Sequence, residues 1–314
     1  MSSAIIFAII ALILAVLSTY KAYKMAFYSS PNRIEDDRAL PDDDQYINCR
    51  DNLLSMIDDL IAQPYEQVYI TSHDGLRLAA RYYHIKDGAP LKIFFHGYRS
   101  TAIHDCCGGF KLCYKARHNA LLIDQRAHGK SEGHVISFGV MEKYDCLGWV
   151  NYAIDRFGPD TKIILSGVSM GAATVLMASD LPLPTNVVCI TSDSGYTSPK
   201  DIIQKIIVDM KLPVAPSYFF VHMSARLFGH FNLEESSAKE SLKKCNIPVL
   251  FVHGEDDRFV PYKMCLENYA ACASEKQMLT VPGAGHGLSF LIDEPGYEKA
   301  ASEFLMRTLS GWDI

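Results

Sequence analysis

Ser169 lies in the segment Gly167-Val168-Ser169-Met170-Gly171, with a glycine two residues away on each side. An apolar run at 163–165 leads into this segment, which predicts a strand that turns sharply into a helix with the serine at the turn. Glycine is expected at both flanking positions because larger side chains would collide with neighbouring backbone in so tight a turn. The serine hydroxyl would then be exposed at the end of a sheet and could act as a nucleophile.

A serine hydroxyl is a weak nucleophile at neutral pH, so it needs a nearby base, and the base needs a carboxylate to orient it. Two later loops offer these groups, each after a short apolar run. Three consecutive acidic residues that end at Asp257 follow the run 249–252, and His286 stands among glycines after the run 277–281. These residue types therefore predict acyl transfer by a serine, a histidine and an acid.

Three further segments make the pattern more specific than the serine motif alone. They are His96-Gly97-Tyr98-Arg99 after an apolar run, the turn from Asp124 to Ser131, and Asp257-x-x-Val260-Pro261. Together they give the chain a resemblance to the serine α/β-hydrolases over roughly residues 65–310. Within that superfamily the chain is similar to membrane-anchored bacterial members of the esterase and serine-aminopeptidase-like branch.

This resemblance implies a mostly parallel, doubly wound sheet of about eight strands and hydrolysis of an ester, thioester or amide. It makes Ser169 the nucleophile, Asp257 the acid and His286 the base, which is the chain order of this fold. The backbone N–H groups of Tyr98 and Met170 would hold the oxyanion of the tetrahedral intermediate. The expected supporting residues are His96, Gly97, Gly167 and Gly171. The mechanism requires no cofactor.

Other polar side chains near these motifs have structural explanations. Asp193 follows the apolar run 187–191 and is a rival for the position of the acid, although its place favours a hydrogen bond to a loop. Arg126 and His128 are expected to brace loops. His253 is expected to pack at the end of the strand that precedes the acid.

Short apolar runs alternate with helical patterns along the chain, which predicts a mostly parallel sheet covered by helices on both faces. The predicted strands are a hairpin over 68–83 and the segments 91–95, 120–123, 162–165, 187–191, 249–252 and 277–281. The predicted helices are 51–61, 141–156, 172–179, 263–273 and 297–309.

Residues 198–235 interrupt this alternation, and we predict that they form a helical insertion that caps the active site. Its apolar side chains would suit an acyl chain or a lipid, and equally the hydrophobic end of a peptide. The residues in question are Ile202, Ile206, Phe219, Phe220 and Phe228. The alternative is an ordinary crossover helix of extra length.

The first 20 residues contain no Asp, Glu, Lys or Arg, and 4–17 is an unbroken apolar run, so this stretch can cross a bilayer as one helix. Lys21 and Lys24 follow the run, whereas a cleaved signal carries its positive charge before the run. We therefore predict a retained anchor over 1–28, with a cleaved signal or a buried helix as alternatives. The two lysines favour a cytoplasmic catalytic domain.

Residues 29–64 are expected to be a linker, with Pro31, Pro41 and a short helix, that lifts the hydrolase domain at 65–314 off the membrane. The net charge is −6 and basic residues do not cluster, so no nucleic-acid partner is expected. Nine cysteines show no framework spacing and fit buried thiols in a reducing compartment. The adjacent Cys106 and Cys107 have no base in view, and no metal-ligand spacing occurs.

The sequence thus predicts a membrane-anchored serine esterase that acts on a small acyl ester or a lipid-like substrate. A serine peptidase, amidase or thioesterase with the same three residues is the first alternative. A non-catalytic, membrane-tethered interaction protein is the second alternative, and the absence of any of the three residues would have favoured it. The oligomeric state does not follow from the sequence.

Overall fold

An eight-stranded sheet forms the centre of the computed structural model, which describes residues 3–30, 36–40 and 44–309. Its strands lie in the order β1-β2-β4-β3-β5-β6-β7-β8. β2 runs antiparallel to both of its neighbours, and the remaining pairs are parallel. The strands are β1 (Glu66–Thr71), β2 (Arg77–Tyr83), β3 (Leu91–Phe95), β4 (Asn119–Asp124), β5 (Ile163–Val168), β6 (Val187–Asp193), β7 (Val249–Gly254) and β8 (Lys276–Val281). The predicted mostly parallel sheet is confirmed.

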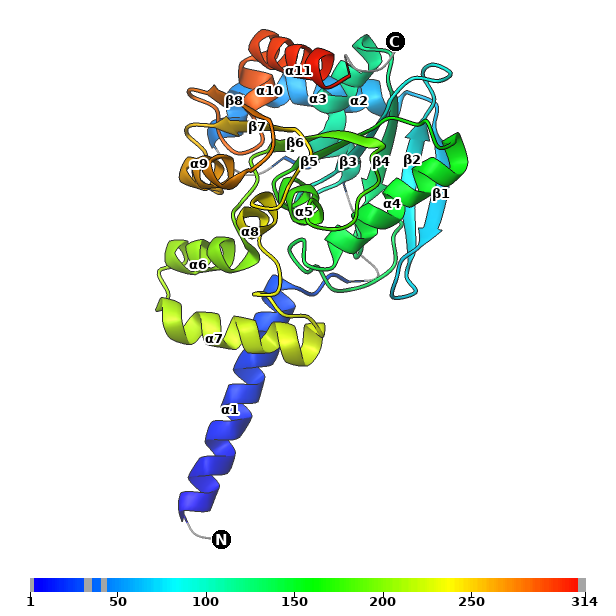
Figure 1. Ribbon diagram of the computed structural model, residues 1–314. Helices are drawn as coiled ribbons and strands as arrows, with labels where there is room; N and C mark the ends of the chain where they lie inside the picture. Colours follow the sequence, from blue (N-terminus) through cyan, green and yellow to red (C-terminus); the bar gives the residue numbers. More distant parts are fainter. Residues whose placement is uncertain (1–2, 31–35, 41–43, 310–314) are drawn as a thin grey trace.

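Helices cover both faces of this sheet (Figure 1). One face carries α2 (Arg50–Ile61), α3 (Ala102–Lys115), α10 (Ser289–Ile292) and α11 (Glu294–Leu309). The other carries α4 (Glu142–Phe157), α5 (Met170–Ala178), α8 (Ala238–Leu242) and α9 (Tyr262–Ala271). The central strands β3, β4 and β7 are buried along their whole length, because apolar side chains on both of their faces pack beneath these helices.

The N-terminal helix α1 (Ser3–Ala26) extends away from the domain (Figure 1). It has 24 residues with a mean hydropathy of 2.5 in its apolar window, and in the described part of the chain it alone is long and apolar enough to cross a membrane. A membrane anchor and a signal sequence both meet this description. Only Thr19 and Tyr23 of α1 are buried.

The end of α1 enters the core of the domain. Phe27 is fully buried and Tyr23 is 5% exposed, and the Phe27 ring packs edge-on against Phe138 and Phe231 at centroid distances of 5.9 and 5.2 Å. The Phe27 carbonyl accepts a hydrogen bond from the Ile136 N–H at 2.8 Å. The packed unit therefore begins at about Tyr23, before the start expected at residue 65.

The segment expected to be a linker also packs on the domain where it is described. It forms a 3-10 helix, η1 (Asp44–Cys49), and then α2, whose Leu53, Ile57 and Leu60 lie in the core beneath one face of the sheet. Pro31 and Pro41 lie outside the described residues.

Residues 198–235 form helices, as predicted. They fold into α6 (Pro199–Asp209), α7 (Val214–Ser224) and a π-helix, η2 (Ala225–Gly229). α7 lies across the domain end of α1 (Figure 1), and the Phe228 ring lies 5.4 and 5.7 Å from the rings of Tyr20 and Tyr23. The insertion therefore packs against the N-terminal helix.

Candidate active site

Ser169 lies at the turn between β5 and α5, where its backbone has φ 55° and ψ −116°. A non-glycine residue rarely adopts a positive φ, so this backbone is strained. A Cβ at position 167 would overlap the Gly171 backbone, and a Cβ at position 171 would overlap the carbonyl of Phe95. Both glycines are therefore required for the turn, for the reason that the sequence suggested.

His286 bridges Ser169 and Asp257. Its Nε2 lies 2.8 Å from Ser169 Oγ, and its Nδ1 lies 2.7 Å from Asp257 Oδ2. Because an ionised carboxylate can only accept, the Nδ1–H donates to Asp257, which leaves Nε2 free to accept the serine proton. The three predicted residues are thus brought together in the geometry of a nucleophile, a base and an orienting acid.

The acid loop holds Asp257 as a carboxylate. Its Oδ1 accepts the N–H groups of Phe259 and Val260, each at 2.8 Å. Burial acts to raise the pKa of Asp257, but hydrogen bonds from His253 and His286 outweigh it, and the pKa lies well below the usual range. His253, which is fully buried, also contacts the Val260 carbonyl through Nε2 at 2.9 Å. It therefore braces the acid loop in addition to packing.

The loop after β3 approaches Ser169 closely. A Cβ on Gly97 would lie 3.3 Å from Ser169 Cβ and 2.9 Å from Asp105 Oδ2. The Tyr98 N–H has no hydrogen-bond partner among the residues described, and Met170 begins α5, where helix N–H groups point outward. The two amides expected to hold an oxyanion thus flank the serine in the fold.

Asp105 fixes this loop, a role that the sequence did not reveal. It accepts the Gly97 N–H at 2.5 Å, the Ser100 hydroxyl at 2.6 Å and the His104 ring at 2.8 Å. Burial would raise its pKa, but the hydrogen bond from His104 and its other polar neighbours lower the pKa to about 2. Thr101 caps the start of α3 by accepting the His104 N–H.

Two histidines, His96 and His128, stabilise the loop that follows β3. His96 Nε2 accepts the Gln125 N–H at 3.1 Å, and His128 Nε2 accepts the Arg99 N–H at 3.1 Å. The two rings lie 4.7 Å apart in an edge-on contact. Arg126 braces a different place, because its guanidinium donates to both Asp74 and Asp145.

The side chains of Tyr98 and Arg99 contact the end of α1. The Tyr98 hydroxyl donates to the Ala26 carbonyl at 2.9 Å, and the Arg99 guanidinium donates to the carbonyls of Met25 at 2.9 Å and Tyr28 at 3.2 Å. The carbonyls of Met25 and Ala26 lie at the C-terminal end of α1, where helix carbonyls lack intrahelical partners. The loop beside Ser169 and the end of α1 are therefore joined directly.

Known proteins resemble this chain in sequence and in fold. A family model described as alpha/beta hydrolase fold matches residues 93–215, and a model described as TAP-like protein matches residues 230–309. The chain belongs to the α/β-hydrolase superfamily. The esterase Pf2001 of Pyrococcus furiosus is 22% identical with a TM-score of 0.65, over 90% of this chain and 98% of that one. At this identity the likeness shows the shared fold.

Two relatives are similar to this chain in sequence at low identity. The uncharacterized protein YqkD of Bacillus subtilis is 26% identical over 188 residues, which are 60% of this α/β-hydrolase and 62% of YqkD. The match thus spans less than two thirds of that relative. The bifunctional esterase/perhydrolase DCH of Acinetobacter calcoaceticus is 22% identical over 262 residues, with 70% of this chain and 93% of DCH covered.

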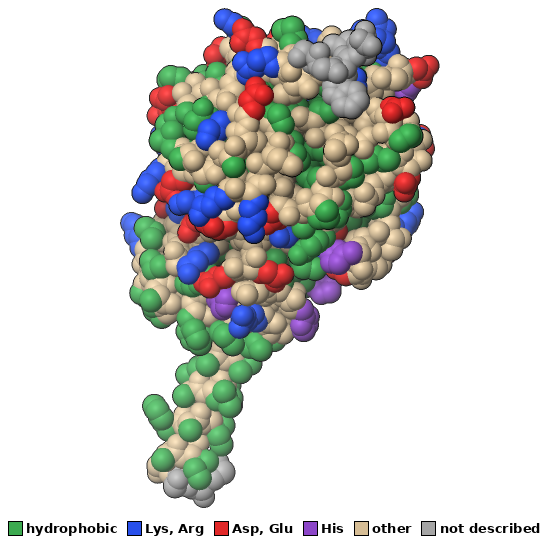
Figure 2. Space-filling view, in the orientation of Figure 1, with side chains coloured by type: hydrophobic (Ala, Val, Ile, Leu, Met, Phe, Trp, Pro, Cys, Tyr) green, Lys and Arg blue, Asp and Glu red, His purple; other side chains and the backbone are tan. Residues whose placement is uncertain are grey.

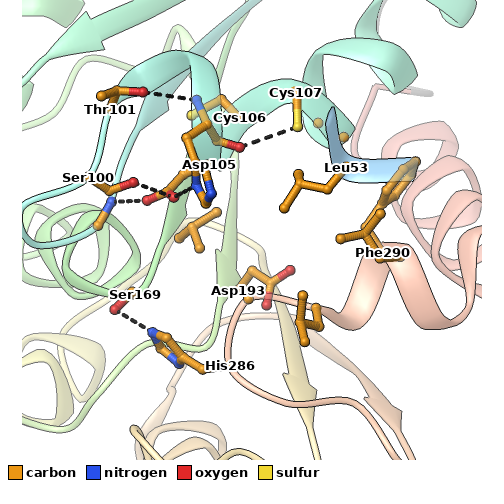
Figure 3. Close-up of a pocket in the computed structure, with 18 of the residues that line it drawn as sticks. Leu53, Ser100, Thr101, Asp105, Cys106, Cys107, Ser169, Asp193, His286 and Phe290 are labelled. Carbon is orange, nitrogen blue, oxygen red and sulfur yellow. Dashed lines mark hydrogen bonds and ion pairs between the residues drawn. The ribbon is translucent and has the colours of Figure 1, made fainter. Parts of the chain in front are cut away.

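A cavity of about 630 Å³ opens beside Ser169 in this α/β-hydrolase. It runs from Ser169 and His286 toward the side of the sheet covered by α2 and α3, with Asp193 between that pair and Phe290 (Figure 3). Its apolar wall includes Leu40, Leu53, Met56, Phe94, Phe290 and Leu291. The cavity can therefore hold an apolar group attached to a carbonyl at Ser169.

The expected cap contributes nothing to this lining. No residue of 198–235 borders the cavity, so the side chains expected to suit an acyl chain, a lipid or the end of a peptide do not line it: Ile202, Ile206, Phe219, Phe220 and Phe228. Residues between Asp36 and Met56 border it instead, including Tyr46, whose hydroxyl donates to the His286 carbonyl at 3.0 Å. Apolar content alone could not show which helix faces the cavity, because the same kind of side chain packs against α1 at Phe228, lies in the core at Ile202 and is exposed at Phe219.

Asp193 lies on the cavity wall, and His286 pairs with Asp257 instead. Asp193 accepts a hydrogen bond from the Ser194 hydroxyl at 3.0 Å, and burial raises the pKa of Asp193 to about 6. The thiols of Cys106 and Cys107 also border the cavity, and burial raises the pKa of Cys107 to about 12. All nine cysteines are buried and unpaired, as expected.

One group of described residues has the spacing of metal ligands. The ligand atoms of His73, Asp74 and Asp145 lie within 4.8 Å of one another. Both carboxylates already receive hydrogen bonds from Arg126, at 2.9 Å for Asp74 and 2.6 Å for Asp145. The guanidinium supplies the positive charge that these acids need.

Proposed function

We propose that this protein is a serine hydrolase that cleaves carboxylic esters through an acyl-enzyme on Ser169. The observation that carries the proposal is the pair of contacts made by His286, 2.8 Å from Ser169 Oγ and 2.7 Å from the ionised Asp257. Acyl transfer requires a serine nucleophile, a base that can accept its proton and an acid that orients the base. This site contains all three groups, with the serine at a strained turn.

In the first half of the reaction, Ser169 Oγ attacks the ester carbonyl while His286 Nε2 takes the hydroxyl proton. Asp257 stabilises the resulting imidazolium. The N–H groups of Tyr98 and Met170 donate to the oxyanion of the tetrahedral intermediate. The intermediate collapses when the C–O bond to the alcohol breaks, and His286 gives its proton to the departing alcohol.

In the second half, His286 takes a proton from water, and the hydroxide oxygen attacks the acyl carbon on Ser169. A second tetrahedral intermediate forms at the same amides. It collapses with release of the carboxylic acid, and Ser169 recovers its proton from His286. The cycle consumes one water and leaves the enzyme unchanged.

An ester with an apolar acyl group is the substrate class that fits the cavity best. Its wall is apolar at Leu53, Met56 and Phe290, and its volume of about 630 Å³ lies within the usual range for small-molecule sites. The esterase names carried by DCH and Pf2001 support an ester as the substrate and leave its acyl group open.

We also propose that α1 is retained as a membrane anchor. Phe27 is fully buried, and the Tyr98 hydroxyl donates to the carbonyl of Ala26 at 2.9 Å. A leader that is cut away would not supply core contacts to the mature protein. Lys21 and Lys24 lie at the domain end of the helix, which favours a catalytic domain on the cytoplasmic side.

Labelling and hydrolysis by the full chain in detergent test the proposed reaction. A fluorophosphonate probe should label the protein, and p-nitrophenyl esters of short to medium chain length should be hydrolysed. Ser169→Ala should abolish both signals. Ser302→Ala, at an exposed serine of α11, should leave both unchanged.

The substrate panel also contains aminoacyl amides and thioesters. Cleavage of amides alone would replace the esterase proposal by a peptidase, and a preference for thioesters would make the protein a thioesterase. Labelling that persists in Ser169→Ala would refute the assigned nucleophile. A folded chain that is neither labelled nor active would be a binding protein.

A further inference from the structure

The insertion expected over the active site presents an apolar surface to the solvent. Five of its side chains are between 44% and 58% exposed: Val208, Met210, Leu212, Phe219 and Leu227. We call these five residues the insertion surface. The eleven residues of α7 include no Asp, Glu, Lys or Arg, and only Ser224 among them is buried. An exposed apolar surface of this kind typically marks a site of contact with a protein or a membrane.

This surface adjoins the point where α1 leaves the domain. Phe228 of η2 packs against Tyr20 and Tyr23 of α1, and α7 lies across the helix at that level (Figure 1). Figure 2 shows hydrophobic side chains at this end of the domain, continuous with those of α1. The apolar exterior of α1 and the insertion surface therefore form one region.

The length of α1 places the insertion at the boundary of a bilayer. From Ser3 to Tyr20 the helix rises about 26 Å at 1.5 Å per residue. The hydrocarbon core of a membrane is about 30 Å thick. When α1 spans that core, Tyr20, Tyr23 and α7 lie near the headgroups, where tyrosine rings are typically found.

Two positively charged side chains belong to the same insertion as these apolar side chains. Lys211 and Arg226 are exposed and have no ion-pair partner among the described residues. Both side chains can extend toward lipid phosphates while their stems lie along apolar surface. The chemistry of this face is that of an interfacial helix.

We propose that the insertion surface docks on the phospholipid bilayer that α1 crosses, with Phe219 and Leu227 below the headgroups and Lys211 and Arg226 among them. This inference rests on the proposed anchor and is independent of the proposed ester hydrolysis. The domain is then held at two places, so its orientation to the membrane is fixed.

Spin-label depth measurements on the full chain test this docking. Single substitutions Phe219→Cys and Leu227→Cys are labelled in vesicles of phosphatidylcholine and phosphatidylglycerol. The nine native cysteines are buried, so they should not react. The matched control is Met306→Cys, which is 61% exposed on α11, away from α1 (Figure 1). Labels at 219 and 227 should collide more with oxygen than with a water-soluble nickel chelate, and the label at 306 should do the opposite.

A further label at Leu12→Cys, which is 66% exposed on α1, separates the possible failures. If the label at 12 collides more with oxygen and the labels at 219 and 227 collide more with the nickel chelate, the docking is refuted and the anchor stands. An aqueous signal at 12 would refute both. Protection of 219 and 227 from both reagents would show that protein covers this surface, and would also overturn the proposal. Hydrolysis of p-nitrophenyl acetate by these variants should be unchanged.

Discussion

In the proposed mechanism, the chemistry of His286 depends on Asp257. An asparagine at this position could present its amide nitrogen to Nδ1 and so favour the tautomer that cannot accept the serine proton. We expect Asp257→Asn to lower kcat on the order of 10³- to 10⁴-fold with little change in KM. Asp256→Asn, at the exposed neighbouring acid, should retain wild-type kinetics. Similar kcat values for the two variants would contradict the assigned acid.

Asp193 should lower the stability of the protein as the pH rises. Burial raises its pKa to about 6, whereas an unfolded aspartate has a pKa of about 3.9. Between these values the folded state binds more protons, so the free energy of unfolding falls as the pH increases through this window.

Asp193→Asn should remove that pH dependence. Relative to wild type, the free energy of unfolding of the variant should increase by about 2 to 3 kcal/mol from pH 4 to pH 7. Urea unfolding in detergent at the two pH values measures this difference. Asp155→Asn, at an exposed position of α4, is the control. If the free energies of unfolding of Asp193→Asn and wild type differ by the same amount at both pH values, burial does not destabilise the ionised carboxyl.

The sequence identified candidate residues that lie in local motifs, and it missed residues whose contacts depend on the tertiary fold. Ser169 and its glycines are recognisable because the turn itself dictates their types. Asp105 is different, because its carboxylate becomes important only when α3 brings it to the Gly97 amide at 2.5 Å. Tyr46 was likewise invisible, since its contact with His286 spans most of the chain.

At the scale of elements, the close approach of α5 to β3 is the most restrictive packing in the site. A methyl group on residue 171 would overlap the Phe95 backbone, which cannot rotate away as a side chain would. We expect Gly171→Ala to cost about 3 kcal/mol or more in stability and to lower kcat by displacing Ser169. Thermal unfolding and esterase kinetics measure the two effects.

Gly148→Ala is the matched control within a helix. Its Cβ would meet Ile70 Cδ1 at 3.3 Å, the end of a flexible side chain. The variant should be close to wild type in both measurements, and a loss equal to that of Gly171→Ala would show that the close approach is not the cause.

Strands were easier to predict than helices in this chain, for a physical reason. A central strand is buried on both faces, so it appears as a short apolar run whatever packs on it. α3 was not predicted because its 14 residues include two glycines and three cysteines, which obscure the helical pattern. The insertion was predicted to be helical, but its apolar residues could not reveal whether substrate, core or lipid faces them.

At the scale of the whole molecule, α1 and the candidate active site form one connected structure. Tyr98 and Arg99 donate to carbonyls at the end of α1, and the Tyr98 ring stacks on Phe138, which in turn contacts Phe27. A proposed oxyanion donor therefore belongs to a residue that is held by the end of α1. This coupling depends on contacts far apart in sequence, which is why a simple tether was expected.

Two truncations should therefore differ sharply in activity. Removal of residues 1–17 deletes the exposed part of α1 and keeps Tyr23 and Phe27, so hydrolysis of p-nitrophenyl acetate in detergent should persist. Removal of residues 1–28 deletes the buried Phe27, which should cost about 3 to 5 kcal/mol by analogy with core Phe→Ala substitutions. It also removes the acceptors of Tyr98 and Arg99, so kcat should fall.

The full-length variants Phe27→Ala and Tyr98→Phe separate these two contributions. Phe27→Ala should lower the unfolding temperature, because it opens a cavity in the core. Tyr98→Phe keeps the ring stacked on Phe138 and loses only the hydrogen bond to Ala26. It should lower kcat and leave the unfolding temperature close to that of the wild type, because the hydroxyl acts by positioning the loop that carries the Tyr98 amide. If Tyr98→Phe keeps its full kcat and the 1–28 truncation is as active as the 1–17 truncation, the anchor is a tether alone.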